Sequence, residues 1–128
     1  MPTYLLDSNI LIDMLRGRPS TVALLSGLTK EGELAMSALS VFEVKVGIRR
    51  GEEHATNTLL NGIASIAVDR SLASKAAEYA RTYKTRGITL ELVDSVLAAT
   101  AVLNDFTLVT LNASHFPMPE IRLLHVAR

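Results

Sequence analysis

The chain contains no cysteine, and this absence excludes several classes of protein at once. Disulfide-stabilised scaffolds, zinc sites built from thiolates and enzymes with a cysteine nucleophile all require that residue. The uninterrupted apolar runs, such as residues 66–68, are far too short to span a membrane. The N-terminus also lacks the basic segment and long apolar run of a secretion signal. We therefore expect a cytoplasmic protein with no membrane segment.

The chain also has no excess charge of either sign. It holds 13 basic and 13 acidic residues, so its formal net charge is zero. A protein whose whole surface binds polyanions would be strongly basic, and this class is excluded. Contact with a nucleic acid would have to be local, at one of the groups of basic residues within 16–18, 45–50 and 81–86. An ordinary solvated surface explains these groups equally well.

Length and pattern together predict the fold class. The 128 residues are 48% hydrophobic, which suits one buried core, and we expect a single domain spanning residues 1–128. Short apolar runs predict strands at residues 3–6, 34–39, 63–68, 107–110 and 121–126. Helical periodicity predicts helices at residues 10–15, 19–28, 40–50, 52–60, 71–86 and 91–103. This alternation favours an α/β fold with a parallel sheet of about five strands covered by helices on both faces.

Two polar residues stand where predicted strands end. Asp7 follows the first strand directly, and Thr110 ends the fourth. In an open parallel sheet the ligand site lies at the carboxyl ends of the strands, where loops lead into helix N-termini. We therefore expect Asp7 and Thr110 to lie at one rim of the sheet.

Glu43 has a structural explanation as well as a functional one. Ser40 and Glu43 have the spacing of a capping box, in which the glutamate bonds back to the backbone of the cap residue. Gly47, four residues further on, leaves the same helix face thin, so that another element can approach it. We expect the carboxylate of Glu43 to be held inward.

Asp94 is open to the same two explanations. It lies in the first turn of a predicted helix, where the helix dipole stabilises an acid without any further role. Small apolar residues that share its helix face, namely Leu97, Ala98 and Ala101, are typical of a face packed on a sheet. An acid above such a face would be partly buried.

Three acids at one rim would raise one another's pKa values unless a positive group held them. A hard ion such as Mg²⁺ or Mn²⁺ prefers oxygen ligands, and the absence of cysteine and of clustered histidine removes the softer metals. Asp7, Glu43 and Asp94 therefore suggest a carboxylate metal site.

These residues stand in segments that resemble the PIN-domain family, and within it the VapC-type toxins of toxin–antitoxin pairs. Residues 7–13 are similar to the family's opening D-T-N stretch, with Ser8 in place of threonine. Residues 40–47 resemble its S-x-x-x-E and E-x-x-x-G helix, and residues 94–101 its D-x-x-I-A-A-x-A helix. Residues 110–116 resemble T-x-D-x-x-x-F, with Asn112 where an aspartate is common. An amide offers an oxygen without charge, so a second ion would be held poorly.

The resemblance implies a metal-dependent endoribonuclease that arrests growth when free. Asp7, Glu43 and Asp94 would bind Mg²⁺ or Mn²⁺ and Asn112 would complete the rim, with Asn9 and Thr110 orienting these ligands. The ion would acidify a water and offset charge on the phosphoryl oxygens. Candidates for contact with the phosphates of RNA are Lys45, Arg49, Arg50 and Arg86.

The resemblance also implies a cognate antitoxin, whose arginine or lysine would compete with the metal for the carboxylates, and a homodimer. The first two predicted helices carry more aliphatic residues than one sheet face needs, which is compatible with self-association.

Other titratable residues near these motifs leave alternatives open. His115 is a candidate general acid, although packing or a surface position explains a lone histidine beside Phe116 more simply. Asp13 and Asp69 would line the crevice or else be a solvated helix acid and a helix cap, and the second explanation is favoured for both. Glu91, one turn before Asp94, would reach a metal through water.

The competing functions are of other classes. A PIN-like module that has lost activity and only binds a partner is kept open by Asn112. A phosphoacceptor receiver domain needs adjacent acids after the first strand, and a haloacid-dehalogenase-type phosphatase needs Asp-x-Asp there. The chain has Asp7-Ser8-Asn9, which disfavours both. The sequence does not indicate which RNA is cut or at which bases.

Overall fold

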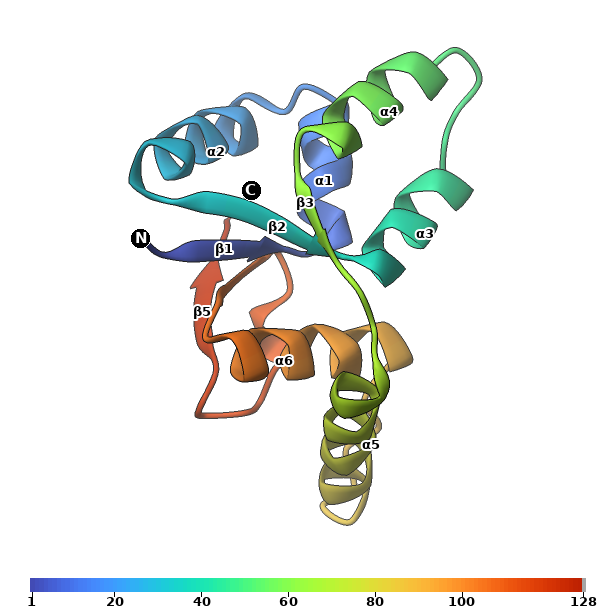
Figure 1. Cartoon of the computed structure of the whole chain (residues 1–128), viewed down its shortest axis with the longest axis vertical. Coiled ribbons are helices and arrows are strands. Elements are labelled where there is room, and N and C mark those ends of the chain that lie inside the picture. Colours follow the sequence, from blue (N-terminus) through green and yellow to red (C-terminus); the bar gives the residue numbers. More distant parts are fainter. Residues whose placement is uncertain (128) are drawn as a thin grey trace.

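A computed structural model describes residues 1–127 of the chain and shows one parallel sheet (Figure 1). The strand order is β3-β2-β1-β4-β5, and every neighbouring pair is parallel. The strands are β1 (Thr3–Leu6), β2 (Glu33–Ser37), β3 (Ala64–Ile66), β4 (Thr107–Thr110) and β5 (Arg122–His125). The predicted α/β fold with a parallel sheet of five strands is confirmed.

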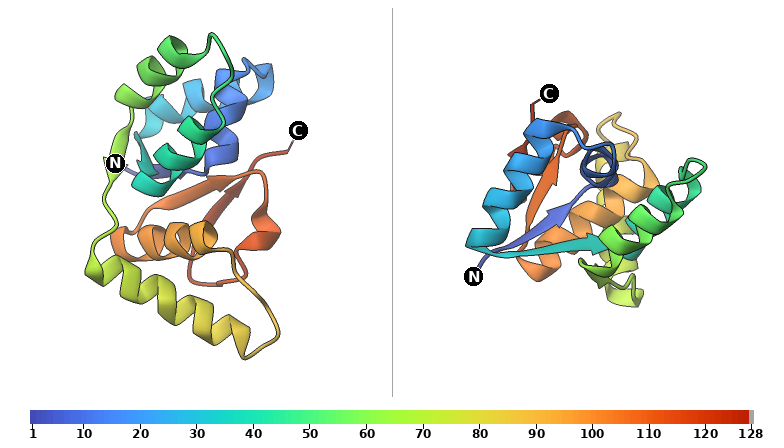
Figure 2. Two further views of the ribbon diagram at one scale, coloured as in Figure 1. Left: turned by 90° about the vertical axis from the view of Figure 1, so that its right-hand side faces the viewer. Right: turned by 90° about the horizontal axis from the view of Figure 1, so that it is seen from above.

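Helices cover both faces of this sheet, as predicted (Figure 2). The first face is covered by α1 (Ser8–Leu15), α2 (Pro19–Glu31), α3 (Ala38–Val46) and α4 (Glu53–Asn61). The second face is covered by α5 (Arg70–Lys84) and α6 (Leu92–Asn104). A short 3-10 turn, η1 (Ala113–His115), follows β4 and was not predicted. Within residues 1–127, no helix is both long enough and apolar enough to cross a membrane.

The central strand β1 explains why one sheet can support two cores. Side chains alternate between the faces of a strand, so Tyr4 and Leu6 pack with α1 and α2, whereas Leu5 packs with α5 and α6. Leu5 and Leu6 are fully buried, and burial of each contributes about 1.5–3 kcal/mol relative to exposure. Because both faces are buried, β1 has the continuous apolar sequence typical of a parallel sheet. The strand thereby fixes Asp7, the next residue, at the rim.

The predicted boundary between β2 and α3 lies two residues too late, and the predicted cap of α3 three residues too late. Ser37, not Ser40, is the N-cap of α3, and its hydroxyl accepts a hydrogen bond of 3.1 Å from the backbone N of Leu39. Ser40 lies inside the helix and is buried, so the predicted capping box of Ser40 and Glu43 does not form. Glu43 stands six residues after the true cap, too far along the helix to bond back to it. Its carboxylate is available for another partner.

Gly47 also differs from its predicted role. This glycine ends α3 as its C-cap, and α3 ends at Val46 rather than near residue 50. The nearest described atoms to a Cβ placed on Gly47 would be carbonyl oxygens of its own helix, both at 3.7 Å. The glycine therefore terminates the helix and does not open its face to a neighbour.

Candidate functional site

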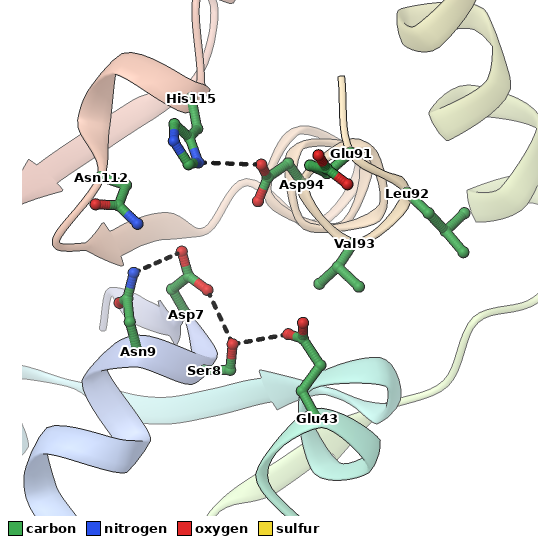
Figure 3. A pocket seen from close by; sticks show the side chains of 10 residues that line it. All are labelled: Asp7, Ser8, Asn9, Glu43, Glu91, Leu92, Val93, Asp94, Asn112 and His115. Carbon is green, nitrogen blue, oxygen red and sulfur yellow. Dashed lines mark hydrogen bonds and ion pairs between the residues drawn. The ribbon is translucent and has the colours of Figure 1, made fainter. Parts of the chain in front are cut away.

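A pocket of about 400 Å³ opens at the carboxyl ends of β1 and β4, between α3 and the first turn of α6 (Figure 3). Its lining includes all three predicted metal ligands and the predicted residue at the fourth position, which are Asp7, Glu43, Asp94 and Asn112. Ser8, Asn9, Glu91 and His115 line it as well. Residues that are up to 108 positions apart in the chain therefore share one concave surface at the place where α/β sheets bind ligands.

Asp7 is the most constrained of these acids. Its backbone N donates to the carbonyl of Val109 at 3.0 Å, which joins the end of β1 to β4. The side chain is buried, and its Oδ2 accepts 2.8 Å from Thr110 Oγ1 and 3.4 Å from Asn9 Nδ2. Two side chains from opposite ends of the chain thus fix one carboxylate oxygen, and Oδ1 is left nearer the pocket.

Thr110 connects Asp7 to the segment that carries Asn112. Its hydroxyl donates to Asp7 and also accepts 3.0 Å from the backbone N of Asn112. Asn9 makes a similar link, because its Oδ1 accepts 3.4 Å from the backbone N of Leu111. Asn9 and Thr110 therefore lie where the sequence places orienting residues, in contact with the predicted ligands or the backbone beside them.

Glu43 points into the same pocket from α3. Ser8 Oγ donates to Glu43 Oε1 at 2.7 Å, and the same hydroxyl lies 3.4 Å from Asp7 Oδ1 (Figure 3). Ser8 therefore stands between the two carboxylates and bonds mainly to Glu43. The prediction that Glu43 is held inward is confirmed, but the partner that holds it is Ser8.

Asp94 stands on the first turn of α6, above a face that is packed as predicted. Leu97, Ala98 and Ala101 are buried in the core under the sheet. Burial raises the pKa of Asp94 above its ordinary value, and the negative charge of Asp7 raises it further. His115 opposes this shift in the pKa, and Glu91 adds to it. Asp94 therefore lies where negative charges gather, and His115 is the neighbour that offsets part of the rise in its pKa.

His115 contacts Asp94 directly. Its Nδ1 lies 3.2 Å from Asp94 Oδ2, and the histidine side chain is 51% exposed whereas that of Asp94 is 15% exposed. His115 is exposed, as a surface position requires, and its ring also lines the pocket; a role as general acid stays a prediction. The sequence signal was its place three residues after Asn112, within the turn that follows β4.

The fit of these residues to a divalent metal depends on the chemistry of the donors. In the side-chain conformations described for residues 1–127, no three histidine or acidic side chains have the spacing of a metal site. Glu43 bonds to Ser8 and Asp94 to His115 instead. The donors are nevertheless hard oxygens, and the repulsion between Asp7 and Asp94 is what a divalent cation would relieve. This donor set of hard oxygens therefore fits Mg²⁺ or Mn²⁺ by its chemistry.

The three other acids considered from the sequence have three different surroundings. Asp69 is the N-cap of α5 and accepts 2.9 Å from the backbone N of Leu72, which confirms the favoured explanation. Asp13 is not a solvated helix acid, because it is buried beside Thr21 Oγ1 at 3.3 Å and Arg18 Nε at 3.6 Å. It fixes the turn between α1 and α2. Glu91 lines the pocket one residue before α6 begins.

The predicted RNA-contact residues lie outside the pocket lining. Lys45, Arg49, Arg50 and Arg86 are all exposed, and the guanidinium carbon of Arg86 stands 5.0 Å from the ring centroid of Tyr83.

Exposed apolar side chains are more prominent on α3, with Phe42 67% and Val46 71% exposed, than on the first two helices, where Val22 is 37% exposed. Contact with RNA and self-association therefore both stay predictions.

Comparison with known proteins places this geometry in a family. The model of the PIN domain matches residues 4–117. A protein named Ribonuclease VapC19, from Mycobacterium tuberculosis, is 36% identical over 120 residues, which cover 92% of this chain and 96% of that protein. Among solved structures, a toxin–antitoxin complex from Klebsiella pneumoniae has a chain with TM-score 0.78 and 27% identity, covering 96% of this chain and 99% of its own. A chain of VapBC2 from Rickettsia felis, bound to a fragment of promoter DNA, has TM-score 0.84 at 21% identity and covers 97% and 98%, which shows the fold alone.

Proposed function

This chain belongs to the PIN-domain family, and we propose from this that it is an endoribonuclease, the toxin of a toxin–antitoxin pair, which hydrolyses phosphodiester bonds of RNA. The observation that carries the proposal is the pocket in which Asp7, Glu43 and Asp94 meet. A relative named as a ribonuclease matches nearly the whole length of both chains. We also propose a single domain over residues 1–128 and, because RNA is the proposed substrate, a cytoplasmic location.

Metal dependence is part of the proposal. Asp7, Glu43 and Asp94 would hold Mg²⁺ or Mn²⁺, with Asn112 offering a neutral oxygen. A divalent ion in such a site supplies a more acidic water and offsets charge on the phosphoryl oxygens. The chain itself supplies orientation, because Thr110 and Asn9 hold Asp7 in one rotamer and Ser8 holds Glu43 near it. With three acids and one amide, the site would hold a first ion more firmly than a second.

The substrate would reach the pocket over exposed basic residues. Lys45 lies on the same helix as Glu43, and Arg49 and Arg50 follow the end of that helix. They form no ion pair within residues 1–127, so their charge is available for phosphates. Arg86 precedes α6 and is a fourth candidate.

The proposed antitoxin would act on the same carboxylates. An arginine or lysine placed in the pocket would neutralise Asp7 and Asp94, whose charges repel each other in the free chain, and would exclude a metal ion. A homodimer is the proposed assembly of the toxin. The exposed apolar side chains of α3, Phe42 and Val46, are a more suitable surface for it than those of α2.

The test compares RNA cleavage by the purified protein with and without Mg²⁺ or Mn²⁺, beside an Asp7→Asn variant. We expect cleavage only with the metal and its loss in the variant. Asp105→Asn is the matched control, because Asp105 is exposed, lies away from the pocket and has the left-handed backbone that asparagine tolerates (φ 58°). Equal cleavage by wild type and Asp7→Asn would refute the site, and no cleavage by either protein with the metal present would favour the alternative of an inactive binding module. Sequencing of RNA ends after brief expression would identify the target.

A further inference from the structure

His115 occupies a position in the pocket that the metal ligands do not explain. It ends η1, the short turn after β4, where its backbone N donates to the carbonyl of Asn112 at 3.0 Å. The next residue, Phe116, is buried in the core below the sheet and anchors the turn. The backbone is therefore fixed on both sides of His115, and the ring is directed over the pocket toward α6 (Figure 3).

The ring contacts one oxygen of Asp94 and leaves the other open. Nδ1 of His115 lies 3.2 Å from Oδ2 of Asp94. The remaining oxygen of Asp94 points toward the side of the pocket where Asp7 lies (Figure 3). The contact does not depend on the charge of the ring, because a neutral imidazole with its proton on Nδ1 and an imidazolium both donate from this atom.

We propose that His115 is a positioning residue: it fixes the rotation of the Asp94 carboxylate through Nδ1, so that the second oxygen stays directed at the metal-binding side of the pocket. This inference rests on the proposed function, in which Asp94 is a ligand. A carboxylate ligand that is itself hydrogen-bonded loses little further rotational freedom on binding an ion. Loss of such a supporting residue typically reduces metal affinity by about 10- to 100-fold.

The contact between His115 and Asp94 matters because few charged ligands are present in this site. Asn112 brings no charge to the position where an acid is common in the family, so the charged donors are Asp7, Glu43 and Asp94. Asp7 is fixed by Thr110 and Asn9, and Glu43 by Ser8. His115 supplies the corresponding support for Asp94, so each of these carboxylates has a side-chain partner that orients it.

Two substitutions separate positioning from proton transfer. In His115→Asn, the side-chain amide can place a donor near the position of Nδ1, but it cannot act as an acid in catalysis. In His115→Leu, the donor is lost. We expect Mn²⁺ affinity, measured by calorimetry on the RNA-free protein, to fall about 10- to 100-fold in His115→Leu and to be largely retained in His115→Asn. RNA cleavage by His115→Leu should recover at saturating Mn²⁺.

Other outcomes would overturn the inference. If wild type and His115→Leu bind Mn²⁺ equally, His115 does not position a ligand. If both variants keep their Mn²⁺ affinity and both lose kcat and the alkaline limb of the pH profile, His115 is a general acid instead. If the wild type neither binds Mn²⁺ nor cleaves RNA, the proposed function fails first and this inference with it. Urea unfolding of each variant checks the fold, and His115→Ala replaces His115→Leu if the latter unfolds.

Discussion

Thr110 offers the most direct test of how the fold prepares this site. The residue is fully buried, and its hydroxyl makes two contacts at once. It donates to Asp7 Oδ2 at 2.8 Å and accepts from the backbone N of Asn112 at 3.0 Å. Thr110→Val keeps the shape of the side chain and replaces this hydroxyl with a methyl group. The substitution therefore removes both hydrogen bonds with little change in packing.

The magnitude follows from the kinds of bond that are lost. A hydrogen bond to a charged group contributes about 1.5–3 kcal/mol to stability, and one between a hydroxyl and a backbone N about 1 kcal/mol. Because Asp7 is buried, water cannot readily replace the lost donor. We expect the free energy of unfolding of Thr110→Val to fall by about 2.5–4 kcal/mol.

Thr110→Ser is the matched control. It keeps the hydroxyl and loses only a methyl group, which costs about 1 kcal/mol. Urea unfolding of the metal-free proteins measures both changes, and Mn²⁺ titration shows whether the affinity of the pocket falls with the orientation of Asp7. A Thr110→Val protein as stable as Thr110→Ser, with unchanged Mn²⁺ affinity, would show that this hydroxyl neither stabilises the fold nor orients Asp7.

Three further predictions concern stability. Burial and the charge of Asp7 raise the pKa of Asp94 above 3.8. Ionisation of Asp94 therefore destabilises the metal-free fold as pH rises through 3.8 toward the raised pKa, and below 3.8 this destabilisation is absent. Asp94→Asn should therefore be more stable than wild type near neutral pH and equal to it in acid, and urea midpoints against pH that run the other way would contradict this. A Cβ on Gly32 would collide with the backbone carbonyl oxygen of Pro2, where β1 and β2 begin, so Gly32→Ala should lose about 1–3 kcal/mol in the same assay. An unchanged urea midpoint would show that the two strands adjust to the added methyl group without cost. Tyr79 donates to Glu120 at 2.6 Å, and this bond lowers the pKa of Glu120. Tyr79→Phe should reduce the free energy of unfolding by about 0.5–1.5 kcal/mol at neutral pH, and this loss should disappear as pH falls through the lowered pKa. A loss that stays constant with pH would point to packing alone.

Two strands whose sequence fits no other element were predicted accurately. Residues 3–6 and 107–110 form β1 and β4 as expected, because each run is apolar, short and ended by a polar residue. The ends of these two strands suffice to predict that Asp7 and Thr110 lie at one rim of the sheet. The ligand end of the sheet thus follows from local sequence.

The segment 34–40 shows where local sequence is ambiguous. Its residues suit a buried strand and a buried helix equally well, and both Ser37 and Ser40 can cap a helix. The choice of Ser37 depends on where β2 stops pairing, which its neighbours β1 and β3 decide through the pairs up to Ala35 and Ser37. The role of Glu43 changed with that choice, from a cap partner to a pocket residue.

The parallel α/β fold, its ligand rim and the acids at that rim can be predicted from the sequence, because periodicity and the ends of apolar runs are local properties of the chain. The side chain that holds each acid becomes known from the three-dimensional packing: Ser8 holds Glu43, Thr110 holds Asp7 and His115 holds Asp94. These partners are 21 to 103 residues apart in the chain. Their distances depend on how the helices pack on the sheet, and no local pattern of residues records that packing.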